Sequence, residues 1–541
     1  MARRQQSVMH DDLPSIERRR FMQGALVGTG LLALPALHAH ATSPKSVVAK
    51  VLGGKIAGAR QSGVFVFKGV PYGADTRTRR FQPALPPERW KRIRDALEYG
   101  PSCPQSNSRE STSEDCLRLN VWTPALRDGA KRPVLVYFHG GEFSSGSGSS
   151  PLYDGTRLCT QGDVVVVTVN HRLNIFGHLY LDRLAGRDYA TSGNVGILDL
   201  VLALEWVRDH AEEFGGDPAC VTVFGQSGGG AKIATLMAMP AAKGLFHRAV
   251  TMSGQQVTAS GPRSATLRAR ACLDSLKIAP SGIAALLKVD TAALVDATRA
   301  NDPTLVGRNV YFGPVLDEDA LLRHPFYPDA PPQSAHIPMI IGNARDETRA
   351  FHGNDPGIHD LTWDELPERL LPALHVDIEP EHVIAEYRRW YPSYTATEVF
   401  FAATTAGRSW RGAVIELELR AQQGTRTYAY QLNYRSPLEN GRYGAMHSMD
   451  IPLIFNNIAQ PGSRTGTTPE AQRTADAMSA ALIAFAHTGN PNHNALPEWR
   501  PYTLPERATM VFDAESKLEN DPRGAERRLF EKVPYIQRGT Y

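Results

Sequence analysis

A serine lies between glycines where a predicted strand gives way to a predicted helix. The β-branched and aromatic run Val221–Phe224 is typical of a buried strand, and Ala231–Met239 is typical of a helix. Between them, Gly225-Gln226-Ser227-Gly228-Gly229 matches the G-x-S-x-G pattern, in which a sharp turn exposes a serine hydroxyl and the glycines let strand and helix pass closely. The pattern predicts a nucleophilic Ser227. A glycine-rich turn with an unreactive serine is the alternative.

An activated serine needs a histidine that takes its proton and a carboxylate that orients the histidine. In a strand–turn–helix setting, the carboxylate and then the histidine follow the serine along the chain. Among the later histidines, only His447 lies in a glycine-containing loop after a late predicted strand, Arg426–Tyr434. The loop Asn343–Thr348 offers two adjacent acids, Asp346 and Glu347, and the residues alone favour neither.

A second glycine-rich loop is suited to stabilising negative charge on a substrate oxygen. His139-Gly140-Gly141-Glu142-Phe143 follows the apolar run Pro133–Phe138 and matches the HGGG-type loop, whose backbone N–H groups complete an oxyanion hole. The start of the helix after Ser227 would add further N–H groups and the positive end of its dipole.

The elements that must position these residues alternate along the chain. Continuous apolar runs, typical of strands covered on both faces, occupy Pro133–Phe138, Val164–Asn170, Ala249–Gly254 and Ile337–Gly342. The helical patterns between them indicate a largely parallel sheet, and an edge hairpin is expected at Val47–Gly54 and Ser62–Val70. Helical segments near 255–335 and 350–440 would cap this sheet and shape the substrate pockets.

Composition is that of an ordinary globular protein. The 541 residues are 42% hydrophobic and 21% charged, and the net charge is +3. Five arginines and three acidic residues precede position 42, so the remaining chain carries 54 basic and 53 acidic residues. No basic stripe indicates a nucleic acid or a membrane surface as a partner.

The first 41 residues are typical of an export signal. Arg18-Arg19-Arg20-Phe21-Met22 precedes a weakly apolar run, Gly24–Leu37, and Ala39-His40-Ala41 offers small residues for cleavage. Twin arginines in this setting resemble a bacterial twin-arginine signal. We expect an exported, periplasmic or secreted protein with one domain over 42–541. The alternative, an uncleaved anchor, is disfavoured because the apolar run is short and contains Pro35.

Five cysteines are compatible with an oxidising compartment if two of them pair. Cys103 and Cys116 lie 13 residues apart across a Ser-rich segment, a spacing that predicts a local disulfide. Cys159, Cys220 and Cys272 lie in apolar contexts and are expected to be buried thiols.

Seven ordered motifs carry a family resemblance that covers essentially all of 42–541. They are Glu114–Val121, His139-Gly140-Gly141, Phe214–Pro218, Val221–Gly229, Gly342–Glu347, His447–Phe455 and Thr488–Asn492. The chain resembles the type-B carboxylesterases, the family that includes the cholinesterases. The resemblance implies an α/β-hydrolase fold with a mostly parallel central sheet flanked by helices and with helical cap insertions.

The resemblance also implies roles for residues. Ser227, Glu347 and His447 would form the catalytic triad, which moves the choice of acid to Glu347. The oxyanion donors would be the N–H groups of Gly141, Glu142 and Gly228, and the supporting residues would be Asp450 and Ser253. Three features of the site motifs depart from the family. Gly-Gln-Ser-Gly-Gly stands where Gly-Glu-Ser-Ala-Gly is commoner, Glu142 stands where Gly or Ala is usual, and Asp346-Glu347-Thr348 lacks the usual Gly.

The implied reaction is hydrolysis of a small-molecule carboxylic ester through an acyl-enzyme, with no metal and no organic cofactor. Two alternatives stay open: a hydrolase of this fold that acts chiefly on amides, carbamates or a bulky natural ester, and a non-catalytic binding module. No tryptophan of the sequence is identified with the one expected in a choline-binding site, which disfavours cholinesterase activity. The sequence does not define the natural substrate or the oligomeric state.

Overall fold

The computed structural model of the protein describes residues 47–279 and 282–540. The chain divides into two units, Met1–Ser43 and Pro44–Tyr541, and the described residues all belong to the second. The expected export signal, residues 1–41, therefore lies outside the described residues.

Thirteen strands of the described residues form one sheet. They are β1 (Val47–Val51), β2 (Gly54–Gln61), β3 (Val64–Pro71), β4 (Arg94–Asp95), β5 (Arg118–Thr123), β6 (Arg132–Phe138), β7 (Val165–Val169), β8 (Gly216–Gln226), β9 (Arg248–Met252), β10 (Met339–Ala344), β11 (Thr427–Leu432), β12 (Ala508–Phe512) and β13 (Lys517–Asn520).

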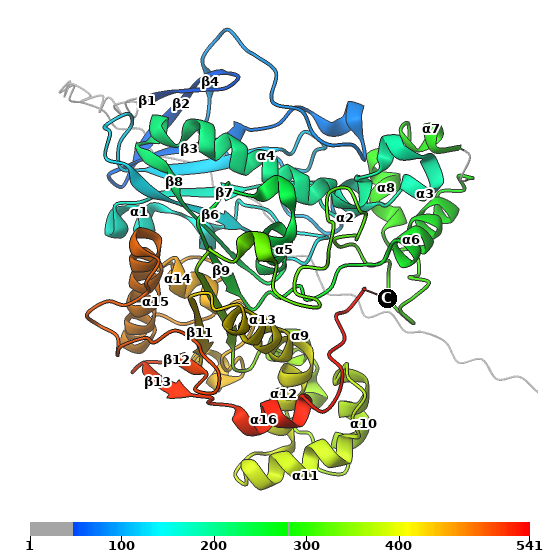
Figure 1. The fold of residues 1–541 in the computed structure, drawn as a ribbon, viewed down its shortest axis with the longest axis vertical. Helices are drawn as coiled ribbons and strands as arrows, with labels where there is room; N and C mark the ends of the chain where they lie inside the picture. Colours follow the sequence, from blue (N-terminus) through cyan, green and yellow to red (C-terminus); the bar gives the residue numbers. More distant parts are fainter. Residues whose placement is uncertain (1–46, 280–281, 541) are drawn as a thin grey trace, which may run out of the picture. The chain divides into compact units, whose positions relative to one another are not determined.

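The middle of this sheet is parallel, in the order β7-β6-β8-β9-β10-β11-β12. The flanking strands β1, β2, β3 and β5 on one side, and β13 on the other, pair antiparallel. Parallel strands need long crossovers, and the helical segments between them supply these. The predicted α/β-hydrolase fold, with a mostly parallel sheet flanked by helices, is confirmed (Figure 1).

The helices of the described residues lie between and after these strands. They are α1 (Thr156–Gly162), α2 (Asn174–His178), α3 (Asp182–Ala185), α4 (Val195–His210), α5 (Gly228–Ala238), α6 (Pro262–Ser275), α7 (Ile283–Leu286), α8 (Thr291–Ala297), α9 (Arg349–His352), α10 (Leu366–Leu370), α11 (Pro380–Trp390), α12 (Ala396–Thr405), α13 (Arg411–Gln422), α14 (Asp450–Ile454), α15 (Pro469–Thr488) and α16 (Gly524–Phe530).

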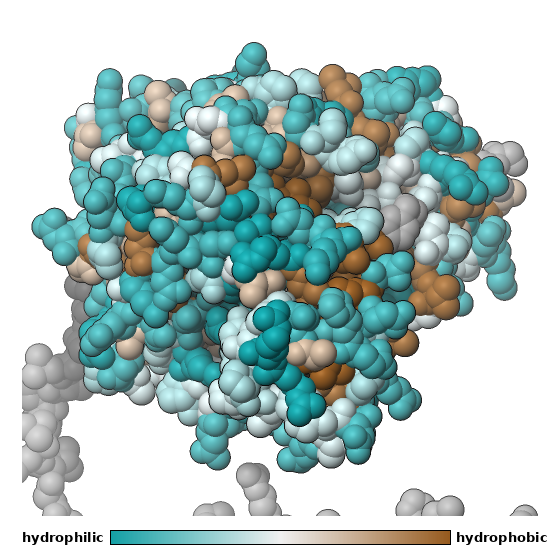
Figure 2. Space-filling view, turned by 60° about the horizontal axis from the view of Figure 1, so that its bottom comes forward, coloured by the Kyte–Doolittle hydropathy of each residue, from teal (hydrophilic) through white to brown (hydrophobic). Residues whose placement is uncertain are grey.

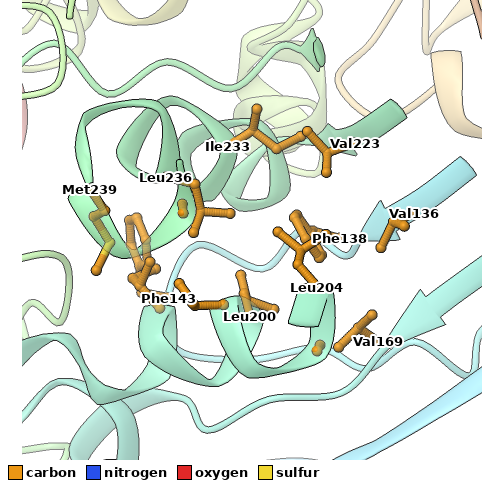
Figure 3. Close-up of a cluster of buried hydrophobic side chains, with 14 of the residues drawn as sticks. Val136, Phe138, Phe143, Val169, Leu200, Leu204, Val223, Ile233, Leu236 and Met239 are labelled. Atoms are coloured by element: carbon orange, nitrogen blue, oxygen red, sulfur yellow. The ribbon is translucent and has the colours of Figure 1, made fainter. Parts of the chain in front are cut away.

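Hydrophobic side chains leave the central strands on both faces. On β6, Val136 and Phe138 join a cluster that contains residues of α4 and α5, and this cluster is drawn in Figure 3. Leu135 and Tyr137 of the same strand join a second cluster, with residues of α14 and α15. Successive residues of a strand point to opposite faces, so a continuous apolar run is needed to fill both clusters.

A third hydrophobic cluster belongs to the late helical region. Its residues come mainly from α10, α11, α12 and α16, which lie together at the lower end of Figure 1. Helices of this region were expected over 350–440. The sequence did not predict β2, whose middle residues Ala57, Gly58 and Ala59 are small. A Cβ at Gly58 would lie 2.6 Å from the Phe67 ring, so the close pairing of β2 with β3 demands the small residue.

The structure contains Cys103 and Cys116 as buried thiols and not as the predicted disulfide. The two thiols are nevertheless neighbours. A hydrogen bond between them is the largest of the causes that raise the pKa of the Cys116 thiol. Cys159 and Cys272 are buried thiols, as expected. Cys220 is only partly buried, since it lies just before the fully buried half of β8.

The face shown in Figure 2 is largely hydrophilic, with apolar side chains gathered in smaller patches. Within the described residues, one helical stretch, Arg187–Phe214, is long and apolar enough to cross a membrane. Of its most apolar window, 72% is buried inside the protein. The stretch includes α4, whose Leu200 and Leu204 pack in the core drawn in Figure 3, so its apolar character is that of a core helix.

Candidate active site

Ser227 occupies the turn between β8 and α5. Its backbone has φ 56° and ψ −125°, a conformation that side-chain-bearing residues adopt only under strain. Its N–H donates to the Met252 carbonyl of β9 at 2.8 Å, which fixes the turn against the neighbouring strand. The sharp strand–turn–helix that the sequence predicts is therefore present.

The glycines around Ser227 are required by the close approach of three chain segments. A Cβ at Gly229 would lie 1.9 Å from the Phe138 carbonyl oxygen, and one at Gly225 would lie 2.6 Å from the Gly229 backbone. A Cβ at Gly228 would lie 2.1 Å from the Glu142 oxygen. The loop after β6 is thus pressed against the start of α5.

That loop turns sharply at Gly141 and Glu142, with φ values of 86° and 53°. The Ser145 N–H closes the turn by donating to the Gly141 carbonyl at 3.0 Å. The buried Lys232 of α5 supports the loop by donating a hydrogen bond to the His139 carbonyl at 3.0 Å. Burial lowers the pKa of Lys232 to about 7. The N–H groups of Gly141, Glu142 and Gly228 have no protein acceptor within the described residues.

Glu347 contacts His447 directly. The distance between Glu347 Oε2 and His447 Nδ1 is 2.5 Å, and Glu347 is completely buried just after β10. Glu347 Oε1 accepts the Ala344 N–H at 2.8 Å. Burial opposes ionisation of Glu347, but His447 and these hydrogen bonds outweigh it and hold the pKa of the carboxyl below its ordinary value.

Asp346 points away from the imidazole. Its Oδ2 accepts the Ala445 N–H at 3.0 Å, and its own N–H donates to the Ala445 carbonyl at 2.9 Å. The two acids therefore contact the same loop in different ways. Glu347 contacts the side chain of His447, and Asp346 binds the backbone of Ala445.

Asp450 and Ser253 both act on Glu347, Asp450 from outside the lining of the active-site cavity and Ser253 from within it. Burial, and then the negative charge of Glu347, raise the pKa of Asp450 to about 6, while the Tyr430 hydroxyl donates to its Oδ2 at 2.8 Å. The Ser253 hydroxyl helps to lower the pKa of Glu347 but makes no hydrogen bond of regular geometry within the described residues. Asp450 approaches Glu347 as a second carboxyl group and not as a direct partner of His447.

A model of the carboxylesterase family matches residues 43–530. The chain belongs to the carboxylesterase family. It is 34% identical to the para-nitrobenzyl esterase of Bacillus subtilis (strain 168) over 496 residues, which cover 88% of this chain and 96% of that protein. It is 31% identical to the phenmedipham hydrolase of Pseudarthrobacter oxydans, with 86% and 95% of the two chains covered.

The solved carboxylesterase EST55 of Geobacillus stearothermophilus has the same fold. Its TM-score to this chain is 0.80 at 38% sequence identity, over 89% of this chain and 99% of that one. Family membership and these relatives make the protein a carboxylic ester hydrolase.

In this carboxylesterase, Gln226 makes a contact that sequence reasoning missed. Its Nε2 lies 3.2 Å from His447 Nε2 and 3.4 Å from His447 Nδ1, so the amide lies against the imidazole. Ser448 donates to Gln226 Oε1 at 3.1 Å. The only sign of this contact in the sequence was the unusual glutamine beside the serine. The sequence does not show that Gln226 and His447, 221 positions apart, lie together in the fold.

A cavity of about 530 Å³ joins these residues. Its lining includes most of the predicted site: Gly141, Glu142, Ser227, Gly228, Ser253 and His447. Glu347 and Asp450 lie outside the lining, behind His447. The opposite walls come from segments that no motif marked, and they include Tyr311, Phe351, His375, Arg408 and Arg538.

Proposed function

We propose that Ser227 is the nucleophile of this ester hydrolase, His447 its general base and Glu347 the acid that orients His447. The observation that carries the proposal is the 2.5 Å contact of Glu347 Oε2 with Nδ1 of His447, a residue that lines the same cavity as Ser227. A proton on Nδ1 donated to an ionised Glu347 leaves the lone pair on Nε2, the atom that Gln226 Nε2 approaches to 3.2 Å, to accept the serine proton. The low pKa of Glu347 supports its ionised state.

In the proposed reaction, the Ser227 oxygen attacks the ester carbonyl carbon while its proton passes to His447. The carbonyl oxygen becomes an oxyanion, bound by the N–H groups of Gly141, Glu142 and Gly228, and one such donor is worth about 10²–10³ in rate. The C–O bond to the alcohol then breaks and His447 returns the proton to the departing oxygen. Water repeats the sequence on the acyl-enzyme and releases the carboxylic acid.

We assign supporting roles to Asp450 and Ser253, both next to Glu347. The Ser253 hydroxyl stabilises the ionised form of Glu347, and Asp450 with its elevated pKa adds a second acidic group to the buried cluster. Both would tune the electrostatic environment of Glu347, Asp450 from outside the cavity lining and Ser253 from within it.

The experiment that tests the nucleophile is covalent labelling. Diethyl 4-nitrophenyl phosphate should phosphorylate the enzyme once, and peptide mass spectrometry should locate the adduct on Ser227. Ser227→Ala should take up no label and lose about 10⁶ in kcat while it keeps the wild-type melting temperature. A label on another residue, or a tenth of the wild-type activity in Ser227→Ala, would reject the assignment.

The preferred acyl group is part of the same proposal. A panel of 4-nitrophenyl esters of increasing chain length, with a 4-nitroanilide beside it, distinguishes an esterase of small molecules from a hydrolase that acts chiefly on amides, carbamates or bulky esters. We expect the esters to be hydrolysed and the anilide to be a far poorer substrate, because an amine is a worse leaving group than a phenolate.

We further propose that residues 1–41 direct export and that the exported protein forms the Cys103–Cys116 disulfide. The twin arginines support the first point, and the neighbouring thiols support the second. Replacing Arg18 and Arg19 by lysine should retain the protein in the cytoplasm of a bacterial host. Peptide mapping of exported wild-type protein should find a Cys103–Cys116 crosslink. Free, alkylatable thiols in that material would reject the disulfide.

A further inference from the structure

Arg408 enters the active-site cavity from a π-helical turn. The turn, Ala406–Trp410, separates α12 from α13, and in it the Arg411 N–H donates back to the Ala406 carbonyl. Such turns inside helices are frequent at functional sites. Gln255, also in the cavity wall, donates to the Ser409 carbonyl at 2.6 Å and fixes the turn beside the nucleophile loop.

The Arg408 guanidinium stacks on the ring of Phe351, 3.7 Å from the ring centre. The Phe351 ring in turn lies 5.0 Å from the His447 ring, so only one aromatic side chain separates the guanidinium from the proposed base. Within the described residues, the Arg408 side chain makes no hydrogen bond or ion pair, although the carboxylates of Glu142 and Glu347 are near enough to raise its pKa. Burial is the main cause that lowers the pKa of Arg408, because a buried site solvates a charge poorly.

Charges of both signs act on Arg408: the carboxylates of Glu142 and Glu347 raise its pKa, and Arg538 and Arg308 lower it. Burial, together with Arg408, Arg308 and Arg538, lowers the pKa of His375 to about 4. Among the described residues, Glu142 is the one carboxylate in the cavity lining; its Oε1 lies 3.7 Å from Arg538 Nη1, and both side chains are exposed.

A second cavity, of about 540 Å³, adjoins the first. The two share Glu142, Tyr311 and Arg538, and the lining of the second also includes Arg299 and Arg308. The arginines of this adjoining cavity would attract an anionic substrate group and raise its local concentration near the first cavity.

We propose that this enzyme hydrolyses esters that carry a second, ionised carboxylate, which pairs with Arg408 while the scissile carbonyl lies at Ser227. The guanidinium offers five N–H donors in a planar fork that fits a carboxylate with two parallel hydrogen bonds. A bound carboxylate would supply the partner that the protein does not. The inference rests on the proposed function of Ser227 and narrows its substrate class.

The test compares mono-4-nitrophenyl adipate with 4-nitrophenyl hexanoate, two esters with the same leaving group and acyl chain length. The adipate ester ends in a carboxylate and the hexanoate ester in a methyl group. We expect the wild type to favour the adipate ester in kcat/KM, and Arg408→Gln to lower this preference at least about tenfold, as expected for a lost charge-assisted hydrogen-bonded pair. The exposed Arg308→Gln should lower it less, and Arg408→Lys should restore part of it.

Arg473→Gln is the matched control, since Arg473 is exposed on α15 and pairs with Glu470. It should keep the wild-type preference. Raising the salt from about 0.05 to about 0.5 M should reduce the preference in the wild type, because screening weakens charge pairing. A wild type that hydrolyses the hexanoate ester and shows no preference for the adipate ester, or a preference that Arg408→Gln leaves intact, overturns the inference but not the ester hydrolase.

Binding without turnover gives an independent readout. Calorimetric titration of adipate into the Ser227→Ala variant should show binding, and the Ser227→Ala/Arg408→Gln double variant should lose it. Equal binding by both, or by neither, overturns the inference. If the wild type hydrolyses neither ester and Ser227 takes up no phosphoryl label, the proposed function itself falls.

Discussion

His447 Nδ1 lies 2.5 Å from Glu347 Oε2, while the neighbouring Asp346 turns its carboxylate to the Ala445 N–H. Both acids lie in the turn that follows β10, and their carboxylates leave it towards different partners, so only Glu347 contacts the imidazole. Asp346 stabilises the loop that carries His447 through its hydrogen bond to the Ala445 backbone.

This relationship predicts different defects in two amide variants. Glu347→Gln should lower kcat by about 10⁴, because an amide no longer favours the imidazole tautomer with its proton on Nδ1. Asp346→Asn should keep most of kcat but lower the melting temperature, because the backbone contact to Ala445 weakens. Steady-state kinetics and thermal unfolding of both variants provide the measurement. A large loss of kcat confined to Asp346→Asn would reverse the two roles.

The sequence predicted what depends on local patterns. Sequence reasoning found the turn at Ser227, the glycine loop at Gly141 and the buried parallel strands, because a few adjacent residues determine each of them. Which of Asp346 and Glu347 contacts His447 depends on the backbone conformation of their loop, and residue types alone do not determine that conformation. Gln226 and Arg408 were missed because their contacts join segments far apart in the sequence. Strand β2 was missed because its small residues lack an apolar run.

The conformation of Glu142 predicts which substitutions the oxyanion loop tolerates. Its φ of 53° favours glycine over any residue with a Cβ, by roughly 1 kcal/mol. Glu142→Gly should therefore fold at least as stably as the wild type, and Glu142→Gly and Glu142→Ala should keep kcat within about tenfold, because the N–H group remains. Glu142→Pro should lower kcat by at least about 10², since proline lacks this donor. An alanine variant as inactive as the proline variant would assign a catalytic role to the carboxylate itself.

The contact between Gln226 and His447 predicts a change in pH dependence. In Gln226→Glu, a carboxylate would lie against the imidazole and stabilise its protonated form, which cannot act as a base. The acid limb of the kcat/KM profile should therefore move to higher pH, with the greatest loss of activity near pH 6 and a smaller one above pH 8. Ser448→Ala, which removes the hydrogen bond to Gln226 but adds no charge, is the control and should leave the position of the limb unchanged. Coincident limbs for Gln226→Glu and the wild type would contradict the prediction.

Glu416 of α13 predicts a pH-dependent stability unrelated to catalysis. It is completely buried, its Oε1 accepts the Gln256 N–H at 2.8 Å, and its Oε2 has no partner within the described residues. Burial raises the pKa of Glu416 from 4.5 to about 8. Between these two values the folded protein keeps a proton that the unfolded chain releases, so the stability that this group contributes is present below pH 4.5 and is lost as the pH rises towards 8.

Glu416→Gln should remove this loss, because the amide is neutral at every pH and still accepts the Gln256 N–H. We expect the melting temperature of Glu416→Gln to exceed that of the wild type at pH 8–9 and to approach it near pH 4.5, since each pKa unit corresponds to about 1.4 kcal/mol. Glu418→Gln is the control: Glu418, two residues on, pairs with Arg507 at 3.1 Å and is partly exposed. It should not produce a melting-temperature advantage that grows with pH. Parallel pH profiles of melting temperature for the wild type and Glu416→Gln would show that Glu416 is already ionised in the folded protein at neutral pH.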